Sequence, residues 1–116
     1  MTASSQITLA EAKSKDLVPC VDGVPLHSLH NPVREAEVFA SNHLAHLSKS
    51  PFALVLGLGF GYHVQEISKI LRLRHKNFRV GVVEMMPDLA RLCESYRGPL
   101  EGVDVFTAKA NRPLWL

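Results

Sequence analysis

Short apolar runs recur in the second half of the chain. Residues 52–56 are apolar at every position and do not alternate with polar residues, which predicts a strand buried on both faces of a sheet. Residues 78–83 predict a second buried strand, and residues 103–106 predict a third.

Amphipathic stretches separate these runs. Residues 62–76 carry apolar side chains at the helical period, and Pro87 begins another such stretch, with Gly98 where a helix C-cap is expected. Strand–helix–strand–helix–strand alternation predicts a parallel sheet with right-handed crossovers. We expect strand order 3-2-1, as in one half of a doubly wound sheet.

The first fifty residues predict a β-hairpin followed by one helix. Asp22-Gly23 separates two β-prone runs, LVPCV and VPLHS, and this dipeptide favours a two-residue hairpin turn. Asn31 is suited to cap a helix that starts at Pro32. The apolar stripe of that helix is Val33, Ala36, Ala40, Leu44 and Leu47, and the helix is expected to end at residues 48–51.

The whole chain therefore predicts one α/β domain, residues 1–116, of the Rossmann-like half-domain class. Residues 1–6 are expected to be disordered. Residues 7–50 form the hairpin and helix, and residues 51–116 form the βαβαβ unit. A three-stranded parallel sheet has exposed edges, which either the hairpin of this chain or self-association could cover. We expect a homodimer or a protein partner, with the apolar tail at residues 114–116 as a candidate anchor.

The composition argues against several classes of partner, namely nucleic acid, membranes and metal ions. A formal net charge of +2 is too small to favour nucleic acid, and the basic residues between 72 and 79 fall at the end of a predicted helix, where cations suit the dipole. No apolar run is long enough to cross a bilayer and no signal peptide is evident, so we expect a cytoplasmic protein that does not bind membranes. The two cysteines lack metal-ligand spacing. His27 and His30, and likewise His43 and His46, are three positions apart and could chelate zinc on a helix, but no cysteine or carboxylate completes a recognisable set, so no metal site is predicted.

Three glycines at alternate positions follow the first predicted strand, in GLGFG. Glycine permits positive φ and close approach of a ligand, and the helix N-terminus behind the turn favours an anion. Glu84 ends the second predicted strand, where an acidic residue commonly accepts hydrogen bonds from ribose. The candidate cofactor-binding residues are Gly57, Gly59, Gly61, Tyr62, His63 and Glu84, and the cofactor is a nucleotide or S-adenosylmethionine, with its identity unknown.

Each of these residues also has a structural interpretation. The turn could be only a tight corner, with Glu84 solvated or capping a helix. Tyr62 could stack on a ligand ring or lie in the core. His63 could contact a ligand anion or pack against the first helix. The G-x-G-x-G form is similar to the first motif of S-adenosylmethionine methyltransferases, although Leu54, Val55 and Leu56 stand where those proteins carry an acid.

Two stretches together resemble one family. LHSLHNPVREAEVF, followed later by VLGLGFGYHVQEI, is similar to the N-terminal domain of the motility accessory factor proteins, bacterial proteins implicated in flagellin glycosylation with nonulosonic acid sugars and related to archaeal 6-hydroxymethylpterin diphosphokinase. The resemblance covers about residues 17–110. The matching positions are His27, Ser28, Pro32, Glu35, Ala36, Gly57, Leu58, Gly59, Gly61, Tyr62 and His63.

The resemblance implies the Rossmann-like module without the family's downstream transferase domain, and no catalytic residue is carried over. Three functions follow as alternatives. The first is a non-catalytic module with a nucleoside or S-adenosylmethionine crevice. The second is an interaction or scaffold domain whose crevice is empty, and the third is a methyltransferase-like enzyme.

Overall fold

The computed structural model describes residues 5–107, so the tail at 114–116 lies outside the described residues. The strands of this part are β1 (Ile7–Glu11), β2 (Leu17–Val21), β3 (Val24–Pro25), β4 (Phe52–Leu56), β5 (Arg79–Glu84) and β6 (Val103–Thr107). The helices are α1 (Pro32–Asn42), α2 (Leu44–Lys49), α3 (Tyr62–Arg74) and α4 (Pro87–Arg97). None of these helices is long and apolar enough to cross a membrane.

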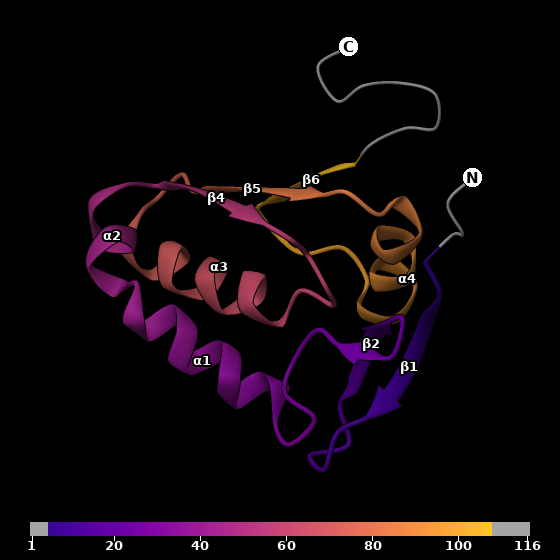
Figure 1. Ribbon diagram of the computed structural model, residues 1–116. Helices are drawn as coiled ribbons and strands as arrows, with labels where there is room; N and C mark the ends of the chain where they lie inside the picture. The colour runs from indigo at the N-terminus through magenta and orange to yellow at the C-terminus, as the bar shows by residue number, and fades with distance from the viewer. Residues whose placement is uncertain (1–4, 108–116) are drawn as a thin grey trace.

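The second half of the described chain forms a three-stranded parallel sheet in which β5 lies between β4 and β6. The α3 and α4 helices lie beneath this sheet in Figure 1, where they connect its strands. The predicted α/β class and three-stranded parallel sheet are therefore confirmed. The core lies between sheet and helices, where the largest fully buried side chains include Phe60, Leu71, Val80 and Val82.

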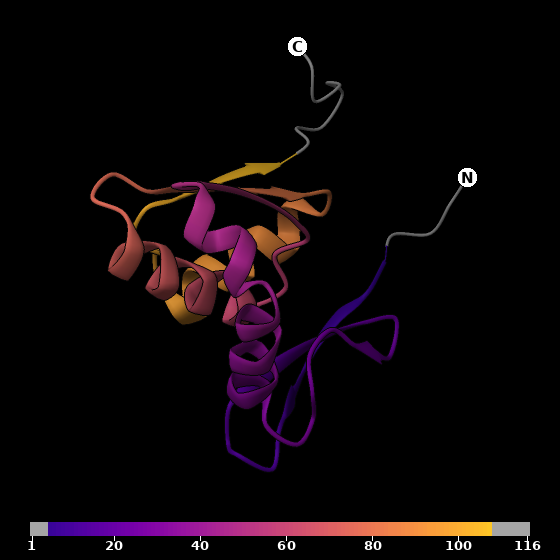
Figure 2. The ribbon, with the colours of Figure 1, turned by 90° about the vertical axis from the view of Figure 1, so that its left-hand side faces the viewer.

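The prediction that residues 52–56 are buried on both faces is wrong. Phe52, Leu54 and Leu56 are 66%, 71% and 78% exposed, whereas Ala53 and Val55 pack against the core. Figure 2 shows the reason, because α3 and α4 lie on the same side of the parallel sheet. The described residues leave the other face of β4 uncovered.

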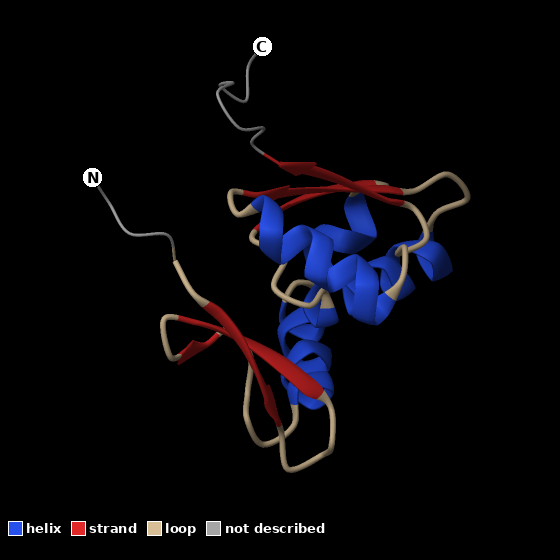
Figure 3. Ribbon diagram, turned by 90° about the vertical axis from the view of Figure 1, so that its right-hand side faces the viewer, coloured by secondary structure: helices blue, strands red, loops and turns tan. Residues whose placement is uncertain are grey.

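The N-terminal segment forms a three-stranded antiparallel sheet, β1-β2-β3, where the sequence predicted a two-stranded hairpin. The β1 strand was not predicted, and β3 has only two residues. Asp22 and Gly23 join β2 to β3 with φ values of 50° and 83°, and such left-handed turns suit Asp-Gly. Figure 3 shows this sheet beside the helices and apart from the parallel sheet.

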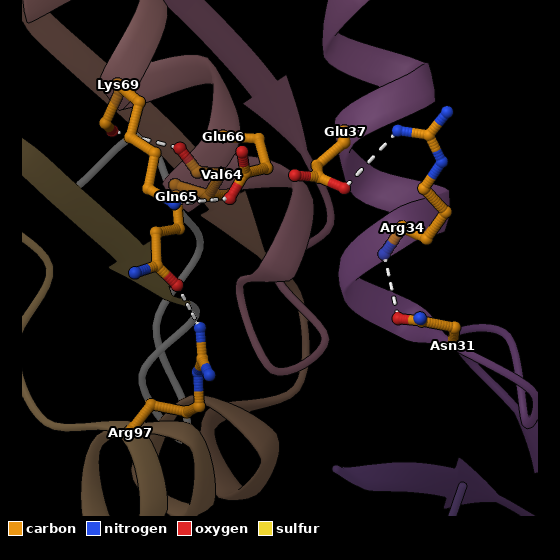
Figure 4. Close-up of polar contacts among 9 residues, drawn as sticks. Asn31, Arg34, Glu37, Val64, Gln65, Glu66, Lys69 and Arg97 are labelled. Atoms are coloured by element: carbon orange, nitrogen blue, oxygen red, sulfur yellow. Dashed lines mark hydrogen bonds and ion pairs between the residues drawn. The ribbon is translucent and has the colours of Figure 1, made fainter. Parts of the chain in front are cut away.

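The single helix predicted from Pro32 is two helices. The cap at Asn31 is confirmed, since its side-chain oxygen accepts a hydrogen bond of 3.0 Å from the Arg34 N–H, as drawn in Figure 4. The helix is interrupted at His43, whose φ of −108° and ψ of 12° are not helical. The α1 helix packs against α3, and its buried residues Ala36 and Ala40 face that contact.

Candidate functional site

A glycine turn, residues 57–61, joins β4 to α3. The φ values of Gly57, Gly59 and Gly61 are +94°, +55° and +75°, a range that favours glycine. The Gly57 N–H donates to the Val83 carbonyl at 2.8 Å, which fixes the start of the turn against β5. Gly61 is the N-cap of α3, so the turn leads directly into the positive end of that helix dipole.

Glu84 ties this turn to the end of β5. Its side chain is 6% exposed, and one carboxylate oxygen accepts the Leu58 N–H at 2.8 Å. The other oxygen accepts the Met86 N–H at 3.0 Å. A carboxylate offers about four lone-pair positions, so Glu84 retains capacity for further donors. The parallel register brings the carboxyl ends of β4 and β5 together, and the turn and the acid therefore meet.

His27 holds the centre of the turn from the loop between β3 and α1. Its Nε2 accepts the Phe60 N–H at 2.9 Å, so the proton of the neutral ring is on Nδ1. A Cβ placed on Gly59 would lie 2.4 Å from this Nε2. Glycine at position 59 is therefore required by the histidine packed on it. The sequence pattern did not assign His27 to the site, although the family resemblance includes it.

The segment before α1 is also fixed by hydrogen bonds. The Ser28 N–H donates to the Glu35 carboxylate at 2.8 Å, and the Ser28 hydroxyl accepts the His30 and Asn31 N–H groups at 3.1 Å each. These bonds hold the loop that carries His27 against the start of α1.

His63 and Tyr62 both contact other parts of the protein. The His63 Nε2 lies 2.9 Å from the Gly57 carbonyl oxygen and must donate, since a carbonyl only accepts. The His63 ring also meets Phe39 of α1 edge-on, with 6.1 Å between ring centroids. Tyr62 is buried, and its hydroxyl donates to the Leu17 carbonyl at 2.5 Å. The first turn of α3 is thus bonded to the glycine turn and to β2.

Arg97 covers one face of Tyr62. Its guanidinium carbon lies 4.3 Å from the ring centroid, within cation–π range, and the side chain also hydrogen-bonds Gln65, as drawn in Figure 4. The edge of the His27 ring meets the same Tyr62 ring, with 5.0 Å between centroids. Burial raises the pKa of Tyr62 above its ordinary value, although Arg97 opposes that effect.

A cavity of about 350 Å³ lies beside the turn, between α4 and β6. Leu58 of the turn lines it, and so does Thr107, which is the register partner of Glu84 in the sheet. Cys93 also lines it, and burial raises the pKa of that thiol to about 11. The cavity has the volume of a small ligand site. Within residues 5–107, no group of three or more His, Cys, Asp or Glu could hold a metal ion.

The neutral ring of His27 makes the stability of the protein depend on pH. Its pKa is lowered from 6.5 to about 4 by burial, with further repulsion from His63 and Arg97. Between pH 6.5 and 4 the unfolded chain binds a proton that the folded protein does not. The free energy of unfolding should therefore be highest above pH 6.5 and fall by about 3 kcal/mol toward pH 4 from this group alone.

Urea unfolding across that range checks the expectation. His27→Gln retains an oxygen that can accept the Phe60 N–H but does not titrate, so the variant should lose this part of the slope. His30→Gln, at an exposed histidine of the same loop, should retain it. Equal slopes in wild type and His27→Gln would contradict the assignment.

No protein-family model matches the chain, and no curated protein matches it. The resemblance to motility accessory factors therefore remains a prediction. Among solved structures, the fold is similar to that of MnmC2 from Aquifex aeolicus, with a TM-score of 0.57 and 17% sequence identity. The match covers 92% of this chain and 44% of that one, so this chain spans less than half of that protein's length. The likeness supports a Rossmann-like fold for this chain.

Proposed function

We propose that this protein is a binding module for a nucleoside of the S-adenosylmethionine class. The hydrogen bond of 2.8 Å from the Leu58 N–H to Glu84 carries the proposal, because it unites the glycine turn and the acid in one site. The site lies at the carboxyl ends of the strands, where ligands bind in open α/β sheets. The remaining lone pairs of Glu84 would accept the ribose hydroxyls.

The surroundings of Glu84 support a nucleoside in particular. Met85 follows it directly and is 61% exposed, which provides an apolar surface for a flat base. The cavity beside Leu58 reaches Thr107, next to Glu84 in the sheet, and would receive the rest of the ligand. The N-terminus of α3 behind Gly61 favours a carboxylate or phosphate on the same ligand.

We propose binding without catalysis. The Cys93 thiol, with its pKa raised to about 11, is protonated at neutral pH and is a poor nucleophile. The Nε2 of His27 is occupied by the Phe60 N–H and cannot serve as a base while that bond persists.

We also retain a relation to the flagellin-glycosylation accessory proteins as part of this proposal. The two segments that carry the resemblance are far apart in sequence, yet His27 of one accepts a hydrogen bond from Phe60 of the other. Ser28 and Glu35 of the first segment are bonded to each other as well. Contacts between the two segments are expected if both belong to one structural module that this chain shares with those proteins.

Amide NMR with S-adenosylmethionine, S-adenosylhomocysteine, NAD, CMP and GDP tests the binding proposal. At least one of these should shift the amide signals of Leu58, Gly59 and Met86. Met85→Ser should raise the dissociation constant of that ligand by roughly tenfold, equivalent to about 1.4 kcal/mol of binding free energy. Leu73→Ser removes a comparably exposed apolar side chain from α3 and should leave the affinity unchanged. Unchanged turn amides with all five ligands would refute nucleoside binding.

A further inference from the structure

The described residues leave one face of the parallel sheet uncovered, and this face carries a continuous apolar surface. Phe52, Leu54 and Leu56 of β4 project to it and are 66%, 71% and 78% exposed. Leu56 lies beside Val83 of β5, which lies beside Phe106 of β6, 56% exposed. We call these five residues the open face.

The side chains of the open face lie close to one another across the middle strand. A Cβ placed on Gly81 would be 3.5 Å from the Leu54 Cδ1 and 3.8 Å from the Phe106 Cε2. Residues from β4 and β6 thus extend over the glycine of β5 and form one patch. Figures 1 and 2 show α3 and α4 both on the opposite side of the sheet. Parallel sheets are ordinarily covered on both faces, so this patch requires an occupant.

Charge on the same face is balanced. Arg79 and Asp104 project to the side that carries the open face, and the Arg79 guanidinium contacts both Asp104 carboxylate oxygens at 2.6 Å. Their side chains are 56% and 48% exposed. Among the described residues of β4, β5 and β6, this face carries one cation and one anion and therefore has no net charge. Two copies can therefore approach face to face without net electrostatic repulsion.

We propose that the open face binds a second copy of this chain, in a face-to-face dimer of two parallel sheets. Its four large side chains are more than half exposed, and they represent on the order of 500 Å² of apolar surface. Two copies would bury roughly 1,000 Å² in total, at the low end for specific interfaces. The dimer is accordingly weak, with its dissociation constant in the micromolar range. The two sheets pack about 10 Å apart with their strands nearly aligned.

Sedimentation velocity of the full chain from about 5 to about 200 µM tests this interface. Wild type should pass from monomer to dimer across the series. Leu54→Lys places a charge at the centre of the open face and should raise the dissociation constant more than tenfold. Leu73→Lys places the same charge on an exposed leucine of α3 and should leave it unchanged.

Circular dichroism verifies that each variant is folded, and Leu56→Lys replaces Leu54→Lys if the latter is not. A wild-type monomer at every concentration would overturn the proposal and indicate that another partner, or residues 108–116, covers the open face. A dimer that is equally stable in a folded open-face variant would overturn it as well, because the interface would then lie elsewhere.

Discussion

Gly59→Ala is expected to destabilise the protein by about 3 kcal/mol. A left-handed conformation such as the φ of +55° at this position costs about 1 kcal/mol for alanine. The new Cβ would also lie 2.4 Å from the His27 Nε2 and 2.8 Å from its Cε1, and relieving such a clash costs about 1–3 kcal/mol. The His27 ring cannot retreat without losing its bond to Phe60. Urea unfolding monitored by circular dichroism measures the loss.

A double-mutant cycle with His27→Ala separates the clash from the backbone strain. His27→Ala alone should destabilise the protein, because the Phe60 N–H loses its acceptor. In the double variant the alanine at position 59 does not contact an imidazole ring. The destabilisation caused by Gly59→Ala should then fall to the cost of the left-handed backbone conformation alone. The losses of unfolding free energy in the two single variants should therefore sum to about 1–3 kcal/mol more than the loss in the double variant. If the unfolding free-energy changes of the two substitutions were additive, the His27 ring would not clash with an alanine at position 59.

Glu84→Ala is expected to cost about 3–4 kcal/mol of unfolding free energy. The substitution leaves the N–H groups of Leu58 and Met86 without the carboxylate that accepts both. Hydrogen bonds to charged groups contribute about 1.5–3 kcal/mol each, and this acceptor is buried. Glu84→Gln should lose less, since its amide keeps one acceptor oxygen.

Glu101→Ala is the matched control. Glu101 bonds Arg72 at 2.6 Å, but its side chain is 74% exposed, and such surface pairs contribute at most about 1 kcal/mol. Hydrogen exchange of the Leu58 amide should accelerate in Glu84→Ala and not in the control. Equal destabilisation by the two alanine variants would contradict the linking role of Glu84 and weaken the site built on it.

Local patterns predicted most elements of the parallel-sheet half. The helical period of the apolar residues, together with the residues typical of helix ends, predicted α3 and α4. Gly98 is the C-cap of α4, as expected. They also placed Asn31 as the cap of α1. A strand-to-helix corner needs glycine whatever surrounds it, so residues 57–61 were recognisable as a turn. Parallel pairing then brings strand ends together, so the side chain at the end of β5 lies beside that turn.

Other features depend on contacts between distant segments. An unbroken apolar run is compatible with burial on either or both faces, and only the docking of α3 and α4 on one side leaves Phe52, Leu54 and Leu56 exposed. The β1 strand is stabilised by pairing with β2, and its own sequence has no strong strand period. The break at His43 interrupts a stripe that is continuous in sequence.

The sequence by itself thus determined the order of elements in the Rossmann-like unit and the glycines that turn the chain between β4 and α3. These depend on backbone conformation and on periodicity, which neighbouring residues control. Only the tertiary structure decided that His27 accepts the Phe60 N–H, 33 positions away, and that residues 5–107 leave one face of the sheet uncovered. Both outcomes depend on how whole elements pack, and packing free energy is a property of surfaces that meet only after the chain has folded.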